Sequence, residues 1–218
     1  DFALARRYFA KCAVLRDPVS EFYLGHMCEH GLGGAIDLVQ ARAWYTLAAS
    51  HQAEATGKRS ASDDDDDEGQ QDIWSESETS ADELMVRGNT RRFTRAGIDA
   101  AYLAMSRDDV SDVRGAVLEA RASLGSFFYA GKGGYGDKRQ ARVWLSRAAS
   151  MGHAEAELAL GNMMRLGEGG PADAAQARAL YIRAANRGLV AAQSNAAQML
   201  HEGEGGPVDL EGARNYYR

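Results

Sequence analysis

A segment of 36 residues repeats along this chain, and this repeat constrains the fold more than any other feature of the sequence. Gly131, Gly167 and Gly203 stand 36 positions apart, and each follows an apolar segment and precedes a Gly-Gly pair. Gly31 belongs to the same register, although 100 positions separate it from Gly131. A unit this short cannot bury an apolar face alone, so successive units must stack on one another. The chain is therefore predicted to form a solenoid.

Each unit is predicted to contain two helices joined by a glycine turn. Asp173 stands four residues before a repeated alanine, Ala177, where an aspartate can cap a helix N-terminus. Gly167 falls just past the preceding apolar segment, where a left-handed residue ends a helix. The expected helix pairs are 18–30 with 37–51, 115–130 with 137–150, 153–166 with 173–186, and 190–202 with 209–218, and 1–14 is expected to be the second helix of a preceding pair. The fold class predicted is all-α, a right-handed superhelical solenoid of antiparallel helix pairs.

The register also predicts which side chains are buried. Leu160 and Gly161 mark one face of a first helix, and either Leu180 or Tyr181 marks the facing side of a second helix. Three further residues are expected in the core, because they share a register with buried positions of other copies. These are Cys12, Trp44 and Trp144.

A long acidic insertion interrupts the repeats. The segment 63–83 contains eleven acidic residues and no basic one, which predicts disorder to about residue 80. Apolar spacing then predicts short helices, with Trp74 as a candidate docking anchor. The expected organisation is repeats over 1–55, the insertion over 56–114, and repeats over 115–218. Candidate phosphorylation sites, each with an acid three positions on, are Ser60, Ser62, Ser75, Thr79 and Ser80.

The repeated positions resemble the Sel1-like repeat family, a relative of the tetratricopeptide repeats. The resemblance covers 1–55 and 115–218 and rests on Ala156, Leu160-Gly161, Gly167, Gly169, Asp173, Ala177, Tyr181, Ala184-Ala185, Gly188 and Ala192. The chain departs from the family pattern where Gly-Gly replaces Gly-Val, and where Ala196-Ala197 replaces Leu-Gly. The resemblance implies a protein-binding scaffold or adaptor, without catalysis and without a cofactor. It does not account for the insertion.

The resemblance also implies where a partner binds, because the first helices of such pairs line a concave face. The variable positions between the packing residues of the first helices are His26, Glu29, His30, Ser126, Tyr129, Asn162, Arg165, Gln198 and His201. Their charges are mixed, which favours an extended peptide or a helix over a nucleic acid. Tyr129 and Arg165 are of the residue types that most often dominate binding energy.

Two alternative functions are weaker. His26 to His30 spells H-x-x-E-H, which would suit a metal-dependent hydrolase, but the equivalent positions of the other copies carry no such motif. A luminal adaptor of endoplasmic-reticulum-associated degradation is the alternative within the scaffold class. Two cysteines and the absence of Asn-x-Ser/Thr slightly favour an intracellular location over the endoplasmic-reticulum lumen. No stretch approaches the roughly 20 apolar residues that a membrane-spanning helix needs.

Overall fold

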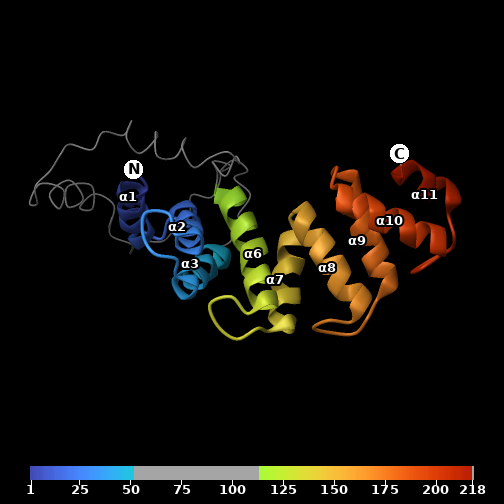
Figure 1. Ribbon diagram of the computed structural model, residues 1–218, viewed down its shortest axis with the longest axis horizontal. Coiled ribbons are helices and arrows are strands. Elements are labelled where there is room, and N and C mark those ends of the chain that lie inside the picture. Colours follow the sequence, from blue (N-terminus) through green and yellow to red (C-terminus); the bar gives the residue numbers. More distant parts are fainter. Residues whose placement is uncertain (52–112, 218) are drawn as a thin grey trace, which may run out of the picture. The chain divides into compact units, whose positions relative to one another are not determined.

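The computed structural model describes residues 1–51 and 113–217, and all regular structure in these two ranges is helical (Figure 1). The helices are α1 (Phe2–Val14), α2 (Pro18–His30), α3 (Leu38–Ser50), α6 (Val113–Ala130), α7 (Lys138–Ser150), α8 (Ala154–Leu166), α9 (Ala174–Asn186), α10 (Val190–Glu202) and α11 (Leu210–Tyr216). The predicted disorder, Trp74 and the candidate phosphorylation sites lie outside the described residues.

The helices form antiparallel pairs that stack in chain order. The first helix of each repeat packs on the second helix of the same repeat, as α2 on α3, α6 on α7, α8 on α9 and α10 on α11. Each second helix also packs on the next first helix, as α1 on α2, α3 on α6, α7 on α8 and α9 on α10. Helices α3 and α6 therefore make the same junction as their counterparts, although the segment 52–112 separates them in sequence. The predicted all-α repeat fold is confirmed.

The helices begin and end where the local chemistry places them. Asp173 accepts a hydrogen bond from the backbone N–H of Gln176 at 2.9 Å, and aspartates cap α1, α2, α3, α7 and α11 in the same manner. Gly167 ends α8 with a φ of 70°, in the left-handed region that a glycine tolerates. Helix α8 begins one residue later than predicted, because the Nδ1 atom of His153 accepts from the backbone N–H of Ala156 and makes this histidine the cap.

Replacing Asp173 by alanine should lower the free energy of unfolding by about 1 kcal/mol, because the first turn of α9 loses its side-chain acceptor. Asp173→Asn should cost only a few tenths of a kcal/mol, since an asparagine also caps helices well. Chemical denaturation followed by circular dichroism measures both. Equal losses for the two variants would show that the charge of Asp173, and not its hydrogen bond, stabilises the helix.

The core between the two helices of a repeat is made by one large side chain against one glycine. Tyr181 of α9 is fully buried against Gly161 of α8, where an added Cβ would lie 2.7 Å from a ring carbon. Tyr45 faces Gly25 and Leu145 faces Gly125 in the same way. These glycines let the two backbones approach closely enough for a large side chain to fill the space between them.

The core prediction for three residues needs correction. Trp44 and Trp144 are only half-buried, because the fully buried position is the next residue along the helix, about 100° further round it. The guanidinium of Arg147 lies 4.4 Å from the ring centre of Trp144, at the edge of the core. Cys12 is also half-buried, with a free thiol.

Candidate functional site

An arginine follows the repeated alanine in each described second helix, and in α3, α7 and α9 it binds the glycine loop of the next repeat. The Nη1 atom of Arg142 donates to the carbonyl of Pro171 at 3.0 Å, and that of Arg178 donates to Pro207 at 2.8 Å. Arg42 reaches Tyr135 at 3.2 Å in the same register. The prediction from the sequence relied on the alanines and missed these arginines, although an Ala-Arg pair recurs in all five second helices that the structure describes.

The loop glycines complete this junction. Gly169 has a φ of 72°, and a Cβ added to it would lie only 2.2 Å from the carbonyl oxygen of Lys138, at the start of α7. Gly133 stands equally close to Leu38, and Gly205 to Ala174. The Gly-x-Gly-Gly segments are therefore turns, as predicted, and they also supply contacts between repeats.

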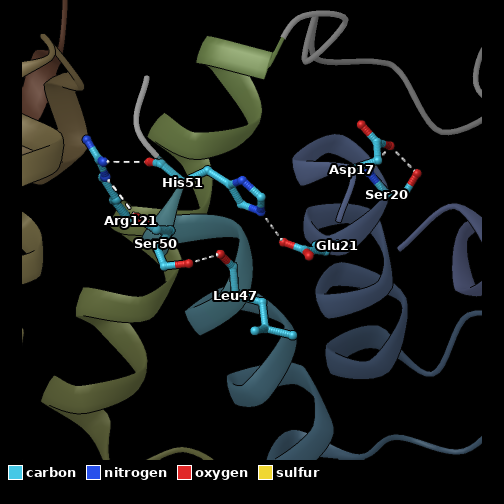
Figure 2. A network of polar contacts seen from close by, with 8 residues as sticks. Asp17, Ser20, Glu21, Leu47, Ser50, His51 and Arg121 are labelled. Atoms are coloured by element: carbon cyan, nitrogen blue, oxygen red, sulfur yellow. Dashed lines mark hydrogen bonds and ion pairs between the residues drawn. The ribbon is translucent and has the colours of Figure 1, made fainter. Parts of the chain in front are cut away.

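A second set of contacts comes from one position of the first helices that is polar in successive repeats, occupied by Glu21, Arg121 and Glu157. Figure 2 shows Arg121 of α6 reaching the end of α3: its Nη2 donates to the carbonyl of His51 at 3.0 Å, and its Nε to that of Ala49 at 3.2 Å. The His51 ring in turn lies 2.9 Å from the carboxylate of Glu21 on α2. Both neighbouring first helices thus hold the last turn of α3, just before the segment 52–112.

Burial sets the protonation behaviour of these groups. It raises the pKa of Glu21, while the charge and the hydrogen bond of His51 oppose the rise. Burial and the nearby Arg147 lower the pKa of Arg121. Glu157 occupies the same register as Glu21 and is 1% exposed, with arginine Nε atoms 3.0 Å (Arg183) and 3.3 Å (Arg187) from its two oxygens.

The structure places the first three predicted partner-binding residues around the end of α2. Glu29 accepts from the hydroxyl of Tyr45 at 3.0 Å and from Lys132 at 2.9 Å. The Nδ1 atom of His30 lies 3.0 Å from the carbonyl of His26, and the two imidazole rings are 4.2 Å apart. Within residues 1–51 and 113–217, no group of three or more His, Cys, Asp or Glu side chains is placed to hold a metal ion.

Three of the other predicted residues bind neighbouring helices or loops. Arg165 of α8 forms an ion pair at 3.0 Å with Glu204, in the loop that follows α10. Asn162 accepts from the hydroxyl of Tyr181 at 2.7 Å. Tyr129 hydrogen-bonds to Glu168, which raises the pKa of its phenol. These contacts give the three side chains a structural role within the solenoid.

The remaining three predicted residues, Ser126, Gln198 and His201, are exposed on first helices. Gln198 donates to Glu202, one turn further along α10, at 3.0 Å. Of these three residues, Ser126 on α6 borders a hollow in the surface.

That hollow has a volume of about 280 Å³ and lies beside α6 and α8. Glu119, Ser123, Ser126 and Phe127 of α6 line it, together with Glu155 of α8 and His153 before it. Sequence reasoning placed Ser126 at this face but missed the two glutamates, because they precede the segment that it treated as variable. Among the described residues, no helix combines the length and apolar character that crossing a membrane requires.

Comparison with known proteins agrees with this architecture. The model of a family described as Sel1 repeat matches residues 18–52, 118–153, 154–189 and 190–218. A solved structure described as a Sel1 repeat protein from Oxalobacter formigenes superposes with a TM-score of 0.64 and 20% identity, covering 99% of this chain and 62% of its own.

A second solved structure is c5321, described as a protective antigen present in uropathogenic Escherichia coli strains and displaying an SLR fold. It superposes with a TM-score of 0.46 and 20% identity, covering 98% of this chain and 40% of its own. The chain thus spans less than two thirds of the length of either protein. No curated protein matches it in sequence.

Proposed function

Because this chain belongs to the Sel1 repeat family, we propose that it is a protein-binding scaffold whose partner lies as an extended peptide or a helix along the first helices. The observation that carries the proposal is that the first helices carry both buried packing positions and exposed polar positions. Packing positions of the first helix, such as Gly161, are buried against the second helix, while Ser126 and Gln198 are exposed beside them. A row of exposed, adaptable polar side chains on a rigid support is typical of a peptide-binding surface.

The contacts at α2 support this proposal over a metal-dependent hydrolase at His26 and His30. A catalytic glutamate must be free to accept a proton from a metal-bound water. The carboxylate of Glu29 instead accepts from Tyr45 and Lys132, while burial and this carboxylate raise the pKa of the Tyr45 phenol and keep it a donor. Glu29 of the H-x-x-E-H segment therefore ties α2 to α3 and to the loop that follows α6.

The test compares a bulky charged substitution on the first helices with one on the second helices. Ser126→Arg places a long side chain at the proposed surface, and Val143→Arg places the same side chain at an exposed position of α7. Partners are purified with the full-length protein, and each identified partner is then titrated against the wild type and both variants. Ser126→Arg should weaken binding by about tenfold or more, which corresponds to about 1.4 kcal/mol.

Val143→Arg should leave the affinity unchanged, and both variants should keep the wild-type melting temperature. Loss of binding in Val143→Arg together with normal binding in Ser126→Arg would move the binding surface to the second helices and overturn the proposal.

A further inference from the structure

We propose that the hollow beside α6 and α8 binds an arginine side chain of the partner, so that the scaffold selects peptides carrying an arginine at one fixed position. This inference rests on the proposed function and specifies the chemistry of its ligand. The argument comes from the shape of the hollow, from its charges and from its single occurrence along the described repeats.

The lining of the hollow combines buried apolar side chains with more exposed carboxylates. Phe127 and Leu145, which line it, are 1% and 3% exposed, whereas Glu155 is exposed and the Glu119 side chain is 38% exposed. A side chain that binds here can lay an apolar stem along the apolar part of the lining and place a polar end at the carboxylates. Long basic side chains have this construction, with methylene groups carrying a charged head.

The charges of the lining favour a cation. Three carboxylates line the hollow, from Glu29, Glu119 and Glu155, against the ammonium of Lys132 and the imidazole of His153. Lys132 lies 2.9 Å from Glu29, and the His153 Nε2 atom lies 3.3 Å from Glu119. Even with His153 protonated, the carboxylates outnumber the cations. An anionic or apolar occupant would leave a carboxylate partly desolvated without a partner, which costs free energy.

The presence of acceptors on two helices favours arginine over lysine. Glu119 and Glu155 occupy the same register on successive first helices, and the hydroxyls of Ser123 and Ser126 lie on the same lining. A guanidinium offers five N–H donors in a planar fork and can bridge acceptors that lie on two helices. An ammonium is a compact point charge with three donors, and satisfies fewer of these acceptors at once.

Among the described repeats, this pair of carboxylates occurs only on α6 and α8. The positions equivalent to Glu119 and Glu155 are Val19 in the repeat before and Ala191 in the repeat after. A peptide that runs along several first helices therefore meets the acidic hollow once. The arginine would set the register of the whole peptide.

The experiment selects short random peptides, displayed on phage, on the immobilised full-length protein and on the Glu119→Gln/Glu155→Gln double variant. Glutamine keeps the shape of each side chain and removes its charge. The wild type should enrich peptides with arginine at one aligned position, and the double variant should not. Glu211→Gln, at an exposed position of α11, is the matched control and should enrich the same peptides as the wild type.

The strongest selected peptide is then synthesised with arginine, lysine or citrulline at the aligned position and titrated by fluorescence anisotropy. Citrulline has nearly the shape of arginine without the charge, so it should weaken binding about tenfold, and so should the double variant with the arginine peptide. Lysine should bind with intermediate affinity. Circular dichroism confirms that the variants are folded.

Other outcomes would separate this inference from the proposed function. Peptides without a conserved basic position that bind the wild type and the double variant equally, and are displaced by Ser126→Arg, would overturn the arginine site and leave the scaffold surface standing. Peptides unaffected by Ser126→Arg but lost in Val143→Arg would overturn both. Selection of no peptide above background would also overturn both.

Discussion

Replacing Gly169 by alanine should lower the free energy of unfolding by about 3 kcal/mol or more, a large effect for the addition of one methyl group. The new Cβ would lie 2.2 Å from the carbonyl oxygen of Lys138 and 2.6 Å from its carbonyl carbon. Both are backbone atoms at the start of α7, so relief requires the two repeats to move apart. The φ of 72° adds about 1 kcal/mol of backbone strain for any residue with a Cβ.

Gly188→Ala is the matched control for this substitution. Gly188 has a φ of 90°, and a Cβ added there would meet nothing within 4 Å. It should therefore cost only the backbone strain, about 1 kcal/mol. Chemical denaturation of both variants, followed by circular dichroism, isolates the contact between the repeats. Equal losses in the two variants would show that the close approach of Gly169 to α7 contributes nothing to stability.

Arg121→Ala should cost about 2 to 3 kcal/mol, because two charge-assisted hydrogen bonds to the end of α3 are lost together. The carbonyls of Ala49 and His51 would lose this donor, in a part-buried position. Amide hydrogen exchange in the last turn of α3 should accelerate along with the loss of stability. Arg114→Ala, at an exposed position of the same helix, should change stability by less than about 0.5 kcal/mol. A small effect of Arg121→Ala on both measurements would contradict the role assigned to this junction.

The sequence predicted the helices accurately because local chemistry determines their limits. An aspartate before a helix and a glycine after it act within a few residues of the chain, as Asp173 and Gly167 do. The predicted helix 173–186 agrees with α9 at Ala174–Asn186. Helix α6 begins at Val113, two residues before the predicted start, and at 18 residues it is longer than the other first helices, which have 13.

The tertiary contacts could not be predicted in the same way. Whether Trp44 or Tyr45 fills the core depends on which of them faces Gly25 on another helix. Arg142 binds the backbone carbonyl of a residue 29 positions away. Every residue has such a carbonyl, so the sequence does not indicate which one an arginine will bind. The binding surface was predicted from variability between copies, yet Arg165 forms an ion pair between repeats. Variable positions thus supply contacts within the array, so variability between copies does not by itself identify a binding surface.

The junction of arginine and glycine makes the repeats interchangeable. Lys138 and Arg142 meet Gly169 and Gly170 with the same contacts that Ala174 and Arg178 make with Gly205 and Gly206. In a chain lacking 154–189, α7 would pack against the loop before α11. This contact would be of the same kind as the contact that α7 makes with the loop before α9. Such a protein can lengthen or shorten by whole helix pairs, and so change how many residues of a ligand it contacts, without a new interface having to evolve.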